Sequence, residues 1–324
     1  MDAAIKVQNL TKRYPSVLAV DHINFEVQKG EFFGFLGPNG AGKTTTINII
    51  TGVTRATSGK ASILGYNLSA EPIKAKEHIG VVPDTSNLYD EMTAWANTLF
   101  CAKLHGVPKE RREERTNELL KRVGLYDRRN DHVGTFSRGM KKRLMIAVAL
   151  VHEPEVLFLD EPTTGLDVQS AREVRGLIRE LNRGGTTIFL TTHYLEEADQ
   201  YCQRIAVISK GKIIVENTPE KLKLSTQTEQ VIEVSFDHAE EVEDRLKRLS
   251  HIRDVVAAGD KFKLYVDDAS AALPVVFDFA KENNLKIISI NTLKPSLEDA
   301  FITLTGLRPE IMSLEKEQMK PNRG

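Results

Sequence analysis

Residues 37–45 read Gly37-Pro38-Asn39-Gly40-Ala41-Gly42-Lys43-Thr44-Thr45, which matches the pattern G-x-x-x-x-G-K-T. The apolar run Glu31–Leu36 before this stretch suits a buried strand, and Thr44–Thr51 after it carries isoleucines at spacings compatible with a helix. Glycines let such a loop aim several backbone N–H groups at one anion, and the following helix adds the positive end of its dipole. A glycine-rich turn before a helix is the alternative for the motif taken by itself. In this context the stretch predicts a phosphate-binding loop.

Two side chains of this loop have roles that follow from their chemistry. Lys43 can bridge the β- and γ-phosphates of a nucleotide, and Thr44 offers a hydroxyl oxygen to Mg²⁺. Mg²⁺ is a hard ion that keeps several of its waters and takes few protein ligands. The sequence therefore predicts a site for a nucleotide together with Mg²⁺.

Length and composition indicate two domains and no strong electrostatic field. The chain has 324 residues, and its 44 Lys and Arg residues nearly balance its 45 Asp and Glu residues. This balance does not support nucleic acid or an anionic lipid surface as a partner. Cys101 and Cys202 lie far apart without metal-ligand spacing, which favours a reducing, cytosolic location over a disulfide framework. Residues 1–6 lack a secretion-signal pattern and no apolar run reaches about 18 residues, so a membrane role would require a partner.

The segments on either side of the loop predict sheet and helix. Apolar and polar residues alternate at Ile5–Val7 and Ile23–Val27, which indicates half-exposed antiparallel strands, and Tyr14 falls in the connection between them. Tyr14 could stack on an adenine or cover the edge of the sheet. Further along, helical spacing over Thr93–His105 and a second helical stretch after it predict a helical subdomain at about residues 88–152. The dense charges of that second stretch are most simply a solvated helix face.

Later polar residues lie where predicted strands and helices end or begin. Ser137 precedes a strong helical pattern and is well placed as its N-cap, a role that needs no further function. The buried strand Val156–Leu159 ends in Asp160, which can serve Mg²⁺, and Glu161, which can polarise a water toward a γ-phosphate. His193 ends another β-rich run. A lone histidine is usually structural. One at the end of a parallel strand, however, is expected at the same edge of the sheet as the two carboxylates.

Together these residues resemble the nucleotide-binding subunit of an ATP-binding-cassette (ABC) transporter, and the order of the landmarks makes the resemblance specific. It covers about residues 1–225 and implies an α/β P-loop NTPase cassette with a mixed sheet core and the helical subdomain. It also implies ATP and Mg²⁺ as cofactors. The expected assembly is a homodimer in which each ATP lies between the phosphate-binding loop of one subunit and the signature loop of the other. Membrane-spanning permease subunits are the other implied partners, at the cytoplasmic face of the membrane.

The resemblance also assigns the site residues. Asp84 stands where the family has glutamine, so its carboxylate is shorter and adds negative charge near the phosphates. Arg138 stands where the signature loop has glycine, and this cation could either assist or obstruct at the partner's γ-phosphate. The implied residues are Tyr14, Gly37 through Thr45, Ser137, Arg138, Gly139 and Asp167 for the nucleotide, Thr44, Asp84 and Asp160 for the metal, and Glu161, His193 and Asp84 for catalysis.

A different pattern begins after the cassette. Over residues 226–306 the order is β-α-β-β-α-β, with the second helix at Leu273–Asn283, and this order matches a small ferredoxin-like α+β domain. No chemistry is visible in it, so a structural, regulatory or dimerisation role is favoured over a second active site. Residues Pro295–Phe301 and Leu304–Gly306 resemble the ending of the drug and sodium exporter ATPases of the daunorubicin-resistance type. The polar tail 307–324 is expected to fray.

The sequence therefore indicates an ATPase subunit that powers a separately encoded membrane exporter. Two other classes keep the same fold. A non-transport ABC ATPase that acts on DNA or ribosomes would be favoured by long coiled-coil insertions or a second cassette, and neither occurs in these residues. A nucleotide-sensing module with weak hydrolysis is suggested by Asp84 and Arg138. A steady-state ATPase assay would separate this module from a transport ATPase.

Overall fold

The computed structural model describes residues 3–225, 230–238, 242–293 and 296–305. The chain divides into two compact units, which we call the N-terminal unit (residues 1–219) and the C-terminal unit (residues 220–306). The sequence placed the corresponding boundary after residue 225. The predicted tail lies outside the described residues, as do Pro295 and Gly306.

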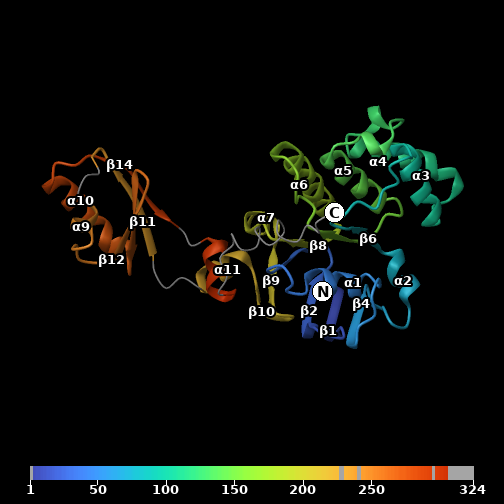
Figure 1. Cartoon of the computed structure of the whole chain (residues 1–324), viewed down its shortest axis with the longest axis horizontal. Coiled ribbons are helices and arrows are strands. Elements are labelled where there is room, and N and C mark those ends of the chain that lie inside the picture. Colours follow the sequence, from blue (N-terminus) through green and yellow to red (C-terminus); the bar gives the residue numbers. More distant parts are fainter. Residues whose placement is uncertain (1–2, 226–229, 239–241, 294–295, 306–324) are drawn as a thin grey trace, which may run out of the picture. The chain divides into compact units, whose positions relative to one another are not determined.

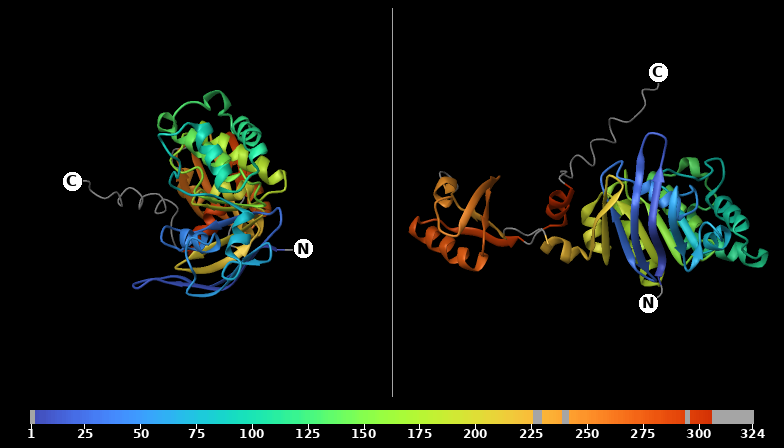
Figure 2. Two further views of the ribbon diagram at one scale, coloured as in Figure 1. Left: turned by 90° about the vertical axis from the view of Figure 1, so that its right-hand side faces the viewer. Right: turned by 90° about the horizontal axis from the view of Figure 1, so that it is seen from below.

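Two sheets form the N-terminal unit, one antiparallel and one mainly parallel (Figure 1). The antiparallel sheet has the strand order β2-β1-β4-β5, and its β1–β2 pair forms a long ribbon (Figure 2). In the other sheet, of order β10-β9-β3-β8-β7-β6, the first strand runs antiparallel to its neighbour and the rest are parallel. The strands are β1 (Ala3–Arg13), β2 (Leu18–Gln28), β3 (Phe32–Leu36), β4 (Ser58–Ile63), β5 (Tyr66–Asn67), β6 (Ile79–Val82), β7 (Val156–Asp160), β8 (Thr187–Thr192), β9 (Arg204–Ser209) and β10 (Lys212–Asn217).

Helices α3, α4 and α5 gather on the side of the unit away from β1 and β2 (Figure 1). Side-chain caps set the starts of α3 and α5: Thr93 Oγ1 accepts from the Ala96 backbone N–H at 3.1 Å, and Ser137 Oγ accepts from Met140 N–H at 3.2 Å. The predicted N-cap at Ser137 is confirmed. The helices of the unit are α1 (Lys43–Ile50), α2 (Pro72–Glu77), α3 (Ala94–Leu104), α4 (Arg112–Arg122), α5 (Arg138–Ala149), α6 (Val168–Arg183), α7 (Leu195–Tyr201) and α8 (Pro219–Ser225), the last of which crosses the boundary, with 3₁₀ turns at Lys109–Arg111, Tyr126–Arg128 and Val133–Thr135.

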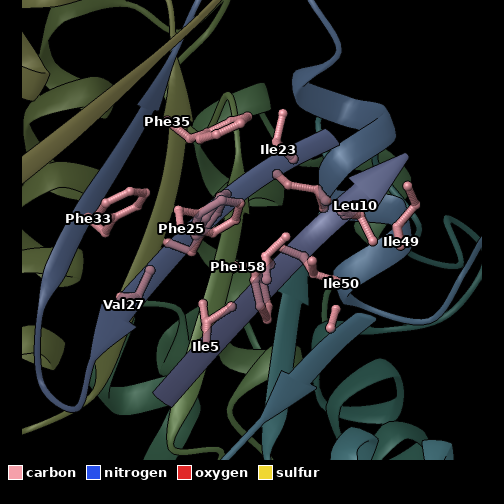
Figure 3. Close-up of a cluster of buried hydrophobic side chains, with 14 of the residues drawn as sticks. Ile5, Leu10, Ile23, Phe25, Val27, Phe33, Phe35, Ile49, Ile50 and Phe158 are labelled. Atoms are coloured by element: carbon pink, nitrogen blue, oxygen red, sulfur yellow. The ribbon is translucent and has the colours of Figure 1, made fainter. Parts of the chain in front are cut away.

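An aromatic cluster joins the two sheets (Figure 3). Phe25 of β2 projects from the antiparallel sheet, and its ring centroid lies 5.8 Å from that of Phe33 and 5.6 Å from that of Phe35, both on β3. Phe189 of β8 lies 5.5 Å from both Phe35 and Phe158 of β7. Each buried ring stabilises the unit by roughly 1.5–3 kcal/mol relative to an exposed one. The cluster therefore fixes the strand that leads into the phosphate-binding loop.

The C-terminal unit has the predicted order of elements and a four-stranded antiparallel sheet of order β12-β13-β11-β14. Helices α9 and α10 cover one face of this sheet, and their apolar residues share a core with the strands (Figures 1 and 2). The ferredoxin-like α+β fold is confirmed, as is the α/β cassette of the N-terminal unit. The elements are β11 (Gln230–Phe236), α9 (Val242–Leu246), β12 (Ile252–Ala258), β13 (Lys261–Val266), α10 (Ala269–Glu282), β14 (Ile287–Leu293) and α11 (Leu297–Thr305).

Helix α10 begins before the expected Leu273, because an N-cap sets its start. Asp268 is the N-cap and accepts from the Ser270 N–H at 2.9 Å. Pro274 lies inside the helix, where a proline normally breaks the hydrogen-bond pattern. None of the helices in the described part of the chain is long and apolar enough to cross a bilayer.

Candidate nucleotide-binding site

The predicted loop connects the end of β3 to the start of α1 and lies beside a cavity. Strands β6 and β7 end at the same rim, because parallel neighbours present their carboxyl ends at one edge of a sheet. The cavity is lined by Ala19, Pro38, Asn39, Gly40, Gly42, Lys43, Thr44, Thr45, Asp84, Asp160 and Glu161.

Close backbone contacts require glycine at two positions of the loop. A Cβ atom at Gly37 would lie 2.2 Å from Ile208 O, and one at Gly42 would lie 2.4 Å from Ala19 O. Gly42 also has a φ of +110°, which L-residues with a side chain rarely adopt. The Ala41 carbonyl accepts from the Gly211 N–H at 2.9 Å. The loop is therefore held tightly against β2 and the β9–β10 turn, with its open side toward the cavity.

Lys43 extends along the loop with its ammonium group almost fully buried. Its Nζ donates to Gly37 O at 2.7 Å and to Pro38 O at 3.2 Å, and it lies 3.9 Å from Glu161 Oε1. A buried ammonium needs such acceptors because removal from water disfavours its charge. These contacts leave the cation at the cavity, where an anion would be the stronger acceptor.

Asp160 is held by two threonine hydroxyls. Thr44 Oγ1 donates to Asp160 Oδ2 at 3.3 Å, and Thr191 Oγ1 donates to Asp160 Oδ1 at 2.5 Å. Burial raises the pKa of Asp160, and the hydrogen bond from Thr191 acts in the opposite direction. The register of β7 and β8 pairs Asp160 with Thr191, which explains their contact. Sequence reasoning missed Thr191, because its contact with Asp160 depends on this register.

Glu161 and His193 are in direct contact. His193 Nδ1 lies 2.6 Å from Glu161 Oε2, and because an ionised carboxylate can only accept, the ring donates in this pair. Thr164 Oγ1 donates to the same carboxylate oxygen at 3.0 Å, a contact that sequence reasoning also missed. The backbone of Glu161 is left-handed, with a φ of +50°, and its N–H donates to Thr191 O at 3.0 Å. His193 and Thr164 thus hold the carboxylate beside Lys43.

The residues assigned to the signature loop and D-loop lie on a second surface of the N-terminal unit. Asp167 caps α6 by accepting from the Ser170 N–H at 2.9 Å. A Cβ at Gly139 would lie 2.3 Å from Ser170 Oγ, so the start of α5 packs closely on the start of α6. Arg138 is exposed, and its Nη1 would lie 3.4 Å from a Cβ placed on Gly165. The cavity lining does not include these residues.

Tyr14 lies in the β1–β2 connection, as expected, and is 39% exposed. Lys12 Nζ is 5.0 Å from the centroid of its ring. The cavity lining does not include Tyr14.

The oxygen atoms at the rim suit a hard cation that is shared with a substrate. The hydroxyl of Thr44 and the carboxylate of Asp160 already lie within 3.3 Å of each other, and Asp84 lines the same cavity. Within the described ranges, no group of three or more His, Cys, Asp or Glu side chains could hold a metal ion. Mg²⁺ keeps several of its waters and shares substrate phosphates, so it needs few protein oxygens.

Two family models match the chain. One, described as "ABC transporter", matches residues 20–164, and the other, described as "ATP-binding protein DrrA1-3-like, C-terminal domain", matches residues 218–305.

Relatives match over almost the whole chain. It is 35% identical over 305 residues to the linearmycin resistance ATP-binding protein LnrL of Bacillus subtilis, covering 93% of this chain and 98% of that protein. It is 35% identical over 317 residues to the daunorubicin/doxorubicin resistance ATP-binding protein DrrA of Streptomyces peucetius, covering 97% and 96%. It is 37% identical over 305 residues to the Nod factor export ATP-binding protein I of Burkholderia pseudomallei, covering 94% and 97%.

Solved structures match about two thirds of the chain. An ATP-binding subunit of an ABC transporter superimposes with a TM-score of 0.63 and 30% identity, covering 68% of this chain and 92% of that one. The dimeric post-hydrolysis state of the ATP-binding cassette MJ0796, bound to ADP and Pi, gives a TM-score of 0.61 and 28% identity, covering 66% and 98%.

Proposed function

The chain belongs to the ABC transporter family of ATP-binding proteins, and from this premise we propose that it hydrolyses ATP to power a separately encoded membrane exporter. Relatives named for linearmycin resistance, daunorubicin/doxorubicin resistance and Nod factor export support the direction of transport. Family membership does not favour a role on DNA or ribosomes. We place the protein at the cytoplasmic face of the membrane, where it would bind permease subunits.

The contact between His193 and Glu161 is the observation that carries the proposed chemistry. Glu161 would accept a proton from a water directed at the γ-phosphate, and His193 and Thr164 would hold its carboxylate in place. Lys43 would exchange its carbonyl acceptors for phosphate oxygens, which bear more negative charge. The loop N–H groups and the start of α1 would bind the remaining phosphate charge.

We assign the metal to the oxygens of Thr44, Asp84 and Asp160. Mg²⁺ bound there would neutralise phosphate charge during the transfer of the γ-phosphoryl group. Thr191 keeps the Asp160 carboxylate turned toward Thr44 by holding its other oxygen. Asp84 departs from the family pattern, and its carboxylate would add a further oxygen at this rim.

We further propose that two copies of the chain form a homodimer around ATP. The surface formed by Ser137, Arg138, Gly139 and Asp167 would close on the cavity of the second copy, so each site would need both subunits. The dimeric state of the related MJ0796 cassette supports this arrangement. Tyr14 would contact the adenine from its place in the β1–β2 connection.

The Glu161→Gln variant tests the function. It keeps the shape of the side chain but cannot take the proton, so kcat should fall by roughly 10²–10⁴ while MgATP still binds. Size-exclusion chromatography with ATP should then show a trapped dimer. Glu196→Gln, an exposed neighbour of the site on α7, is the matched control and should hydrolyse ATP normally. A Glu161→Gln protein that remains monomeric and still turns over ATP would remove Glu161 from the proposed role.

A further inference from the structure

A lysine that the proposed chemistry does not use is buried inside the N-terminal unit. Lys142 lies on α5 and is 6% exposed, whereas its neighbour Lys141 reaches the surface and pairs with Asp90 at 2.8 Å. Lysine is almost never fully buried unless its ammonium group is matched by acceptors. The burial of Lys142 therefore needs an explanation, whereas the position of a surface lysine such as Lys141 needs none.

The ammonium group of Lys142 binds the backbone just after β6. Its Nζ donates to Pro83 O and to Asp84 O, both at 3.1 Å. These carbonyls belong to the first residues of the connection that leads from the parallel sheet to the helices. A charged donor shared by two consecutive carbonyls fixes the path of the chain at this point, because hydrogen bonds from charged groups are stronger than neutral ones.

The two ends of this contact belong to different halves of the proposed ATP site. Asp84 lines the cavity that holds Lys43 and Asp160. Lys142 lies one helical turn after Arg138, on the helix whose N-cap is Ser137. The contact thus joins the chain's own cavity to the surface that would meet the nucleotide of the second copy.

We infer that Lys142 is a positioning residue that couples Asp84 in one ATP site to the signature surface that serves the other. This inference rests on the proposed function, because it assumes that both surfaces bind ATP in the dimer. Because Lys142 Nζ is bonded to both carbonyls, a movement of α5 on dimer closure would move the backbone at Pro83 and Asp84 with it. Closure on the nucleotide of the second copy would therefore adjust the carboxylate of Asp84 in the subunit's own site.

Three variants test the coupling. Lys142→Met keeps the length and apolar stem but removes the donor, Lys142→Arg keeps a charged donor, and Lys141→Met is the matched control on the same helix. In Lys142→Met, kcat and ATP-dependent dimerisation in the Glu161→Gln background should each fall about tenfold, while MgATP affinity of the monomer changes less than about twofold. Lys142→Arg should restore most of this loss, and Lys141→Met should resemble the wild type.

Hydrogen exchange supplies a readout that does not depend on hydrolysis. Amides of residues 84–88 should exchange faster in Lys142→Met, while those of Val156–Asp160 stay unchanged. If Lys142→Met does not fold, Lys142→Gln replaces it, since its shorter side chain withdraws the donor from both carbonyls. Unchanged kcat and exchange in the folded variant, or equal losses in Lys141→Met, would overturn the inference. A wild type without ATPase activity would instead refute the proposed function, and the exchange experiment would still decide whether Lys142 holds this segment.

Discussion

Charged side chains lie inside the N-terminal unit, whereas the C-terminal unit buries apolar side chains almost throughout its described residues. Lys43, Lys142, Asp160, Glu161 and Glu197 are each less than 9% exposed in the first unit. In the described residues of the second unit, Ser235 is the buried polar side chain, and its hydroxyl pairs with that of Ser289 at 2.7 Å.

This difference separates the requirements of chemistry from those of folding. A buried charge costs several kcal/mol unless it is paired, so a region that only has to fold has no reason to contain one. In the N-terminal unit the buried charges are matched by threonine hydroxyls, carbonyls and one another. A structural, regulatory or dimerisation role for the C-terminal unit stays a prediction, on which its contribution should be measurable as stability rather than as nucleotide binding.

Of the substitutions that follow, Lys43→Ala should have the largest effect. A small effect would contradict a functional role for the buried charges of the N-terminal unit. Loss of the buried cation should weaken MgATP binding by about a thousandfold, or ~4 kcal/mol, because two charge-assisted phosphate contacts disappear. Isothermal titration calorimetry with MgATP measures this change. Lys29→Ala, at an exposed position before β3, is the control and should bind MgATP normally. Unchanged affinity in Lys43→Ala would mean that the buried charge has no role in binding.

Leu264→Ala tests the apolar core of the C-terminal unit. Leu264 is fully buried in the core of the C-terminal unit, so its truncation should destabilise that unit by about 3 kcal/mol. Denaturant unfolding followed by hydrogen exchange of residues 230–293 should locate the loss there. MgATP affinity should not change. A folded variant that binds ATP poorly would show that the two units are not separable in function.

Arg138→Gly tests an exposed charge of the N-terminal unit in place of a buried one. It should have the smallest effect. If Arg138 helps to hold the partner's γ-phosphate, the variant should weaken ATP-dependent dimerisation in the Glu161→Gln background about tenfold or less, with lower salt sensitivity. Analytical ultracentrifugation at two salt concentrations measures both. Arg138→Ala distinguishes loss of the charge from the added backbone freedom of glycine at the start of α5. A glycine variant that dimerises more tightly would show that the arginine obstructs the site.

The parts of the site that could be predicted are those encoded in short local patterns. The loop, the two carboxylates after an apolar run, and the serine cap at position 137 each combine residue types with a conformation that only a few residues determine. Parallel strands then bring separate segments to one edge of the sheet. This reasoning located Asp160 and Glu161 on the rim with Lys43, as the cavity lining has them.

The supporting contacts could not be predicted because tertiary register creates them. Thr191 reaches Asp160 only because β8 pairs with β7 at that register, and Lys142 reaches Pro83 only because α5 packs beside the end of β6. Threonine and lysine have many alternative roles, so neither residue stands out in the sequence. The start of α10 at Ala269, ahead of the expected Leu273, is set by the cap at Asp268.

Glu161 combines a left-handed backbone, which lowers the stability of the N-terminal unit, with the carboxylate proposed for ATP hydrolysis. A side chain other than glycine, asparagine or aspartate at a φ of +50° costs on the order of 1–3 kcal/mol, and the surrounding contacts must offset it. On the proposed role of Glu161, residues that relax this conformation would lack the carboxylate at the required length, so backbone stability and hydrolysis would oppose each other at this position. A glycine or asparagine at position 161 should therefore relax the backbone of the N-terminal unit while it removes the proposed base.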